Sequence, residues 1–331
     1  MNTVNNWKLP DLTIESWLKH RLAAAIAYSN GPVNGPLEAG PTSKFTVCSE
    51  TGSMPVGGTG MEPVGGNGAA SGFKPKSETY PNNIPLNRAK NSTRLLYVSA
   101  IALKLSQIWQ QPPQTIVPEL IENLQALCGP DFAVEAAESG MIQFELTDAA
   151  LAVWLQRIAE NFVPLRESRI LSAVVGVDRL FPVQYSHARC CSLLRMAHRS
   201  RIMAIVTNDR PATGQIWSLI APNPIPWLDG DKLRLIHPAE TNLISELLAV
   251  IDRLSPIIEA QKCDKPVDYF KLADRLSAAF GTFYSQCRIW GEVKIETPQL
   301  AQARLGLVLA TQSLLRFMLE ELLNAVAPLE L

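Results

Sequence analysis

The sequence predicts a small α+β domain followed by an all-α helical bundle. Short runs with the two-residue alternation of β-strands lie among helical segments before residue 161, most clearly at Met141–Leu146. After residue 181 the pattern is mostly helical, with short connections, which is typical of a bundle. With 331 residues and 47% apolar side chains, the chain is long enough to give each domain its own core.

The N-terminal region predicts one helix and then a break. Apolar side chains recur at helical spacing over residues 10–29, up to Asn30-Gly31-Pro32. Residues 31–83 are crowded with Gly, Pro, Ser, Thr and Asn, so we predict a flexible insertion there, with a short strand at Phe45–Cys48.

Regular structure is expected again from about Ile84. The apolar spacing predicts helices at about 92–109, 115–127 and 148–161, and strands at 132–134 and 141–146. We therefore assign 1–30 together with 84–161 to the α+β domain.

The remainder divides into a linker, 162–180, and the helical domain, 181–331. IMAIVTND and GQIWSLIA predict a β-hairpin between its first two helices. Thr297 and Pro298 suit the start of the last helix as its cap and its first residue. The predicted helices span about 182–199, 238–260, 266–290 and 298–326.

Composition excludes several classes of function. The formal net charge is −1, so no whole-molecule field would attract a polyanion, and nucleic-acid binding would need a local patch. No signal peptide is recognisable, and no 18-residue apolar run free of charges appears outside the polar-punctuated last helix, so we expect a cytoplasmic protein without a membrane partner. The six cysteines form no CxxC pair, which favours reduced thiols.

Motifs of common enzymes are missing. The sequence has no GxGxxG, GxxxxGK[ST], HExxH or GxSxG. We therefore expect no enzymatic activity, no catalytic residues, no metal site and no cofactor, nucleotide cofactors included.

The stretch FPVQYSHARCCSLLR, residues 181–195, predicts a helix with two faces. On a helical wheel, Val183, Cys190, Leu193, Leu194 and Ala197 share the buried face, and His187 and Cys191 lie near it as core residues. The opposite face could hold phosphates and stack a base, or be an ordinary solvated basic surface. That outward face carries Tyr185, Arg189, Ser192, Arg195 and Arg199.

A second candidate lies in FGTFYSQCRI. Tyr284 follows a phenylalanine, and Arg288 comes one helical turn later. An aromatic pair beside a cation fits both base stacking and simple packing, and the pattern alone leaves both open.

These segments, in this order, resemble the C-terminal half of arginyl-tRNA synthetases. Residues 183–195 are similar to the first helix of the family's DALR anticodon-binding domain, and 266–289 and 300–316 resemble later helices of that domain. The resemblance implies a DALR-like bundle in which Tyr185 and Tyr284 match tyrosines that contact anticodon nucleotides. Arg189, Arg195 and Arg288 match basic positions beside them.

The N-terminal part resembles the additional domain of the same enzymes, which contacts the tRNA D-loop region. IPLNRAKN (84–91) and ESGMIQFEL (138–146) carry this likeness. Where the family has HGDYxxN, this chain keeps Tyr97 but has lost the Gly-Asp turn and the Asn, so D-loop reading is expected to be impaired. The family's catalytic core would stand between the two domains, where this chain has about 20 residues, 161–180.

The resemblance implies a non-catalytic tRNA-binding protein without nucleotide chemistry, favouring the anticodon region of arginine tRNA. The alternative is a protein-interaction or assembly factor that reuses the DALR scaffold without binding RNA. The near-neutral charge and the changed D-loop motif favour this alternative, and so does the predicted flexible insertion.

Overall fold

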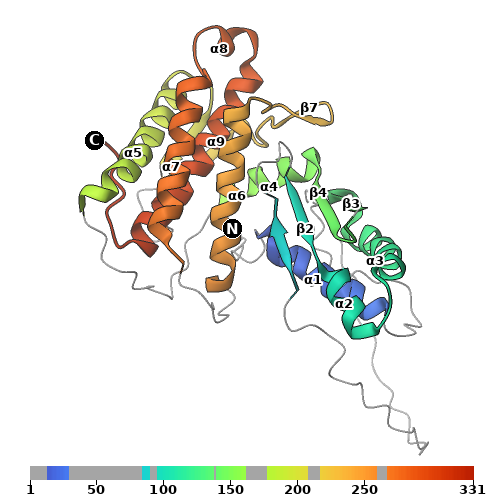
Figure 1. The fold of residues 1–331 in the computed structure, drawn as a ribbon. Helices are drawn as coiled ribbons and strands as arrows, with labels where there is room; N and C mark the ends of the chain where they lie inside the picture. The colour runs from blue at the N-terminus through green and yellow to red at the C-terminus, as the bar shows by residue number, and fades with distance from the viewer. Residues whose placement is uncertain are drawn as a thin grey trace, which may run out of the picture.

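The computed structural model describes residues 13–29, 84–89, 95–137, 139–161, 177–207, 217–258 and 267–331. The whole predicted insertion, 31–83, lies outside these residues, and so does the strand predicted within it at Phe45–Cys48. Most of the predicted linker also lies outside them. In the described part, a small sheet with its helices precedes a set of packed helices, which confirms the predicted fold class (Figure 1).

The N-terminal region is built on a four-stranded antiparallel sheet with the strand order β1-β2-β4-β3. Helices α1 and α3 pack against each other, and α3 also packs on β3. Leu18 and Leu22 of α1, Leu120 of α3 and Phe144 of β4 are fully buried between these layers. The elements are α1 (Ile14–Ser29), β1 (Leu86–Arg88), β2 (Leu96–Ser99), α2 (Ile101–Trp109), α3 (Pro113–Cys128), β3 (Phe132–Ala136), β4 (Ile142–Leu146) and α4 (Asp148–Asn161).

The helix predicted at 92–109 is wrong in its first part. Leu96–Ser99 forms β2, in which Tyr97 lies opposite Phe144 of β4, and the helix begins only at Ile101. Tyr97 and Ser99 point into the core while their neighbours are only half-buried. Pairing on both edges of β2 therefore outweighs the helical pattern of the adjoining residues, which is a tertiary effect.

The C-terminal region surrounds α9. Every residue from 305 to 315 is buried, because α4, α5, α6 and α7 all pack against this helix. The predicted hairpin is confirmed as the antiparallel pair β5–β6. The elements are α5 (Val177–Arg199), β5 (Ala204–Thr207), β6 (Trp217–Ala221), β7 (Leu228–Asp229), β8 (Lys232–Leu233), α6 (Pro238–Ile258), α7 (Tyr269–Gln286), α8 (Glu292–Glu296), α9 (Pro298–Phe317) and a π-helical turn (Met318–Leu322).

The helix predicted at 266–290 spans only Tyr269–Gln286 as α7, and two other helices also differ from their predicted bounds. Helix α5 begins at Val177, not near 182, because buried Leu180 extends its apolar stripe by one turn and Pro182 is accommodated inside the helix. The last helix ends before 326, since Asn324 adopts a left-handed conformation with a φ of 48° after the π-helical turn. The residues that follow lie along α5.

The sheet region and the helical region are joined by a buried carboxylate. Asp252 of α6 accepts hydrogen bonds from the Tyr97 hydroxyl at 2.7 Å and from the Glu15 backbone N–H at 3.2 Å. The Arg88 guanidinium nearby donates to the Ser245 carbonyl of α6. Burial raises the pKa of Asp252 to about 6. This junction fixes α1 and the sheet against α6.

Helix α4 makes the second junction. The Gln156 side-chain oxygen accepts from the Ile225 N–H at 2.9 Å and from the Trp227 indole at 2.8 Å. The indole ring in turn covers Gly306 of α9. The α4 helix, predicted to close the N-terminal domain, therefore also packs along α9 of the helical region.

We expect Tyr97→Phe to destabilise the protein by about 1–3 kcal/mol, because it leaves one oxygen of the buried Asp252 carboxylate without its donor. Urea unfolding at pH 7.5 measures the change. The matched control is Tyr28→Phe, since Tyr28 is half-buried and its hydroxyl makes no hydrogen bond within the described part of the chain. Equal midpoints for both variants would contradict the role of the junction.

Two glycines on helices give a second matched pair. A Cβ at Gly306 would lie 2.4 Å from the Trp227 ring, whereas one at Gly281 of α7 would have nothing within 4 Å. Gly306→Ala should therefore cost about 1–3 kcal/mol through overpacking, and Gly281→Ala should stabilise by about 0.5–1 kcal/mol through helix propensity. Thermal unfolding of both variants checks the opposite signs.

Candidate nucleic-acid interface

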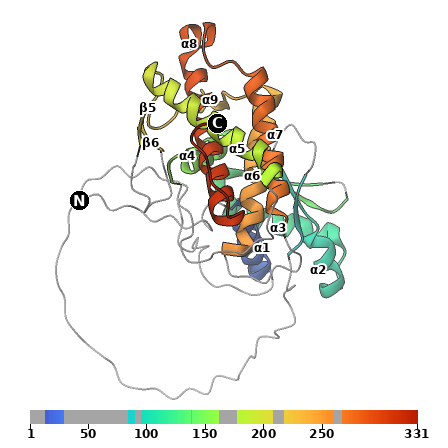
Figure 2. The same cartoon turned by 90° about the vertical axis from the view of Figure 1, so that its left-hand side faces the viewer.

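One stripe of α5 faces solvent. Residues 181, 185, 189, 192, 196 and 199 recur at helical spacing along it, and α5 lies across the front of the bundle in Figure 2. Tyr185 is 51% exposed and Arg199 is exposed at the end of the helix, whereas Arg189 and Ser192 are half-buried. The opposite stripe, predicted to be buried, is confirmed in the core: Val183, Cys190, Leu193, Leu194 and Ala197.

Arg189 of α5 and Tyr284 of α7 are in direct contact. The guanidinium carbon lies 4.6 Å from the centre of the tyrosine ring, and the guanidinium also donates a hydrogen bond to the hydroxyl. Tyr284 is 38% exposed and stacks on the buried Phe280 at 6.3 Å between ring centres. Two predicted site residues that are far apart in the sequence thus form one surface unit.

Phe181 belongs to the same stripe, although it is not among the predicted site residues. Its ring stacks on Tyr185 with 6.2 Å between ring centres, and it is 56% exposed. The signal was available, since an aromatic residue four positions before Tyr185 lies on the same helix face. The exposed aromatic surface therefore consists of two adjoining rings.

Arg195 is engaged by the C-terminal segment. Its guanidinium donates to the Leu329 carbonyl at 3.2 Å and forms a salt bridge with Glu330 at 3.1 Å. Gln184 donates to the Val326 carbonyl at 2.9 Å, so the segment follows α5, as Figure 2 shows. Glu330 is largely exposed, and a pair of this kind contributes at most about 1 kcal/mol. The Arg195 side chain is thus paired with the C-terminal segment but remains partly exposed to solvent.

Arg199 and Arg288 add positive charge farther from the contact between Arg189 and Tyr284. Arg199 lies on α5 about 21 Å past Tyr185 at 1.5 Å per residue. Arg288 is exposed just after α7, and its backbone carbonyl accepts from Arg304. The Arg304 side chain is paired with Glu240 at 2.6 Å, where both are nearly buried, and this pair fixes the backbone at Arg288.

His187, Cys190 and Cys191 are buried, which confirms the prediction that they are core residues. His187 Nδ1 lies 2.8 Å from the Pro328 carbonyl and Nε2 lies 3.0 Å from the Gln312 amide nitrogen, so a neutral ring protonated at Nδ1 satisfies both contacts. Burial lowers the pKa of His187 to about 4 and raises the pKa of Cys191 to about 11. Neither group is set up as a nucleophile or base near neutral pH.

Comparison with known proteins bears on the helical region. Residues 183–330 match the DALR anticodon binding domain. This part of the chain is homologous to arginyl-tRNA synthetases. It is 36% identical over 146 residues to the arginine–tRNA ligase of Synechococcus sp. strain JA-3-3Ab, a match that covers 44% of this chain and 21% of that enzyme.

Two further arginine–tRNA ligases give similar matches. The Pelodictyon phaeoclathratiforme enzyme is 34% identical over 41% of this chain and 20% of its own length. The Moorella thermoacetica enzyme is 31% identical over 45% of this chain and 22% of its own length. The alignments thus span about a fifth of each curated relative. No solved structure matches the chain.

Other kinds of site lack support within the described ranges. None of the helices there is both long and apolar enough to cross a membrane. In the same ranges, no three His, Cys, Asp or Glu side chains gather where they could hold a metal ion. The exposed face of α5 with the end of α7 remains the strongest candidate site.

The buried His187 predicts a pH-dependent stability with a defined sign. Its pKa in the folded protein is about 4, against 6.5 for an ordinary histidine, so between these values the unfolded chain binds the proton more tightly and acidification favours unfolding. The loss amounts to on the order of 3 kcal/mol from pH 6.5 to 4.

Urea unfolding of the parent and of His187→Asn at several pH values tests this. The free energy of unfolding of the parent should fall relative to that of the variant as the pH decreases, because only the parent has the buried imidazole that is protonated on unfolding. Comparison with the variant is needed because Asp252, whose pKa is raised to about 6, gains protons on folding and acts in the opposite direction. A difference that does not vary with pH would disprove the assignment to His187.

Proposed function

We propose that this protein is a non-catalytic tRNA-binding protein related to arginyl-tRNA synthetases, and that it contacts the anticodon region of arginine tRNA. The contact surface is the exposed stripe of α5 together with the end of α7. The observation that carries the proposal is the unit formed by Arg189 and Tyr284 beside the exposed Tyr185, within the part that matches the DALR anticodon binding domain.

The chemistry of this surface suits a single-stranded loop. Unpaired bases stack on exposed aromatic rings, and Phe181 and Tyr185 offer such rings side by side. The Arg189 guanidinium lies on the Tyr284 ring and carries a charge that can meet a phosphate. Arg195, Ser192, Arg199 and Arg288 add donors around this centre. Ring stacking with surrounding cations is the arrangement that single-stranded RNA requires.

The absence of catalysis is part of the proposal. Helix α4 ends at Asn161 and α5 begins at Val177, and the intervening residues are far fewer than a nucleotide-binding domain needs. The matches to the ligases lie within the C-terminal part of this chain and cover about a fifth of each enzyme. These observations support a recognition role without aminoacylation by this chain.

A second candidate function is protein interaction without RNA. It is favoured by the position of Tyr97. The resemblance matches this residue to the D-loop-reading element, but its side chain is fully buried and donates a hydrogen bond to Asp252. It is also favoured by Arg195, whose charge is paired with Glu330. Under this reading the DALR scaffold serves as a docking platform for another protein.

Titration of a fluorescent arginine tRNA transcript over a salt series tests the proposed function. The parent should bind at low salt, and Tyr185→Ala should weaken binding roughly 5- to 150-fold, since stacking of one base contributes about 1–3 kcal/mol. Tyr185→Phe is the matched control, because it keeps the ring and should bind nearly as well as the parent. A tRNA of another specificity should bind less tightly.

Three results would count against the proposal. An absence of binding at low salt, or a Tyr185→Ala variant with the parent's affinity, would remove the RNA contact from this surface. Equal affinity for both tRNAs would remove the preference for arginine tRNA. A stoichiometric protein partner that persists after nuclease treatment, together with no RNA binding, would establish the alternative.

A further inference from the structure

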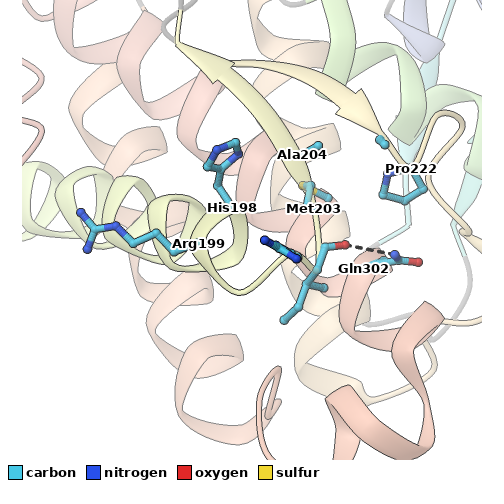
Figure 3. A pocket seen from close by; sticks show the side chains of 9 residues that line it. His198, Arg199, Met203, Ala204, Pro222 and Gln302 are labelled. Carbon is cyan, nitrogen blue, oxygen red and sulfur yellow. Dashed lines mark hydrogen bonds between the residues drawn. The ribbon is translucent and has the colours of Figure 1, made fainter.

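A basic hollow lies at the far end of α5. It is an open depression with a volume of about 620 Å³, bordered by the last turn of α5, the hairpin β5–β6 and helix α9 (Figure 3). His198, Arg199 and Arg201 line it, with Gln302 of α9 on its other wall. The Gln302 amide donates to the Ile202 carbonyl at 3.0 Å and so ties α9 to the floor of the hollow.

The described part of the lining carries positive charge and no carboxylate. No Asp or Glu stands among the described residues that line the hollow. Arg199 and Arg201 are exposed, and neither forms a salt bridge with a carboxylate in the described part of the chain. The Arg199 side chain extends along α5 away from the centre of the hollow, whereas Arg201 lines it without a carboxylate among the described lining residues (Figure 3). This arrangement favours an anionic ligand.

The imidazole of His198 adds a donor to this site. Its Nδ1 accepts a hydrogen bond from the Ile205 backbone N–H at 3.2 Å. Because Nδ1 acts as an acceptor, the hydrogen of the neutral ring must be on Nε2. The bond to β5 thereby fixes the orientation of the ring, and Nε2 remains as a donor without a partner among the described residues.

Cations at a helix C-terminus often serve only to balance the helix dipole and its last carbonyl groups. Here backbone N–H groups already satisfy two of those carbonyls. Arg201 N–H donates to the His198 carbonyl at 3.1 Å, and Ile202 N–H donates to the Ala197 carbonyl at 3.1 Å. The arginine side chains are therefore not required to complete the helix end.

Arg201 also occupies a position that favours glycine. Its φ is 56°, in the left-handed region, at the residue where the helix-ending hydrogen bonds reverse the chain. An arginine in this left-handed conformation is strained by its Cβ, whereas a glycine would not be, so the arginine lowers the stability of the fold. This makes the position suitable for separating a binding role from a structural one.

We propose that this hollow binds a phosphate group of the RNA backbone. The inference rests on the proposed tRNA contact and deepens it. The hollow lies about 21 Å along α5 from Tyr185, so one RNA strand that stacks a base on the aromatic rings can run along the exposed stripe and deliver a phosphate several nucleotides away. Guanidinium groups and an imidazole N–H are the donors that a phosphate oxygen accepts from.

Arg201→Gly tests the proposal in the full chain with the same tRNA titration. Binding at low salt should weaken roughly 5- to 10-fold, and the slope of log K against log salt should become shallower by about one, as expected for one lost phosphate contact. The unfolding midpoint should stay the same or rise, because glycine suits the left-handed backbone. Arg201→Lys, which keeps the charge, should retain most of the affinity.

Arg253→Gln is the matched control for loss of one positive charge. Arg253 is exposed on α6, next to the junction at Asp252, and should leave both affinity and salt slope unchanged. If Arg201→Gly binds like the parent with the same slope while Tyr185→Ala binds weakly, the phosphate site is wrong and the tRNA contact stands. If the parent itself binds no tRNA, both proposals fall together.

Discussion

The amphipathic division of α5 is the constraint on which the candidate interface depends. With 3.6 residues per turn, burying one stripe of a helix determines which side chains face solvent. Val183, Leu193 and Ala197 are at most 2% exposed against the bundle, and rotation of the helix would bring such side chains into water. The outward position of Tyr185 and Arg189 therefore follows from the packing of the opposite face.

The junctions between the two regions give the N-terminal part a structural role. Asp252 is buried, and a buried carboxylate is tolerated only when donors satisfy it. Tyr97 and the N–H of Glu15 supply them from the other region. A tyrosine that the resemblance links to RNA reading thus serves here as an internal hydrogen-bond donor. This limits RNA contact by Tyr97, so the proposed tRNA contact rests on α5 and α7.

The sequence was informative where periodicity is long and local. The inward stripe of α5, the extent of α4 and the pairing of β5 with β6 follow from patterns within single segments. The sequence was less informative where contacts between residues far apart in the chain determine the local structure or the side-chain pairing. Strand β2 is only Leu96–Ser99 and owes its form to both neighbouring strands. The contact of Arg189 with Tyr284 and the pairing of Arg195 with Glu330 join residues that no local pattern connects.

Helix α4 has a consequence for how the chain can be divided. A fragment that starts at α5 would keep the residues matching the DALR domain but would lose the helix that covers one side of α9. The α9 side chains that pack against α4 would then be exposed to water, and the Trp227 indole would lose its acceptor, Gln156. Such a fragment should aggregate during expression because it exposes this apolar surface, whereas a fragment that keeps α4 should stay in solution. We therefore expect the smallest stable fragment of the helical region to begin before α4, not at the start of the sequence match.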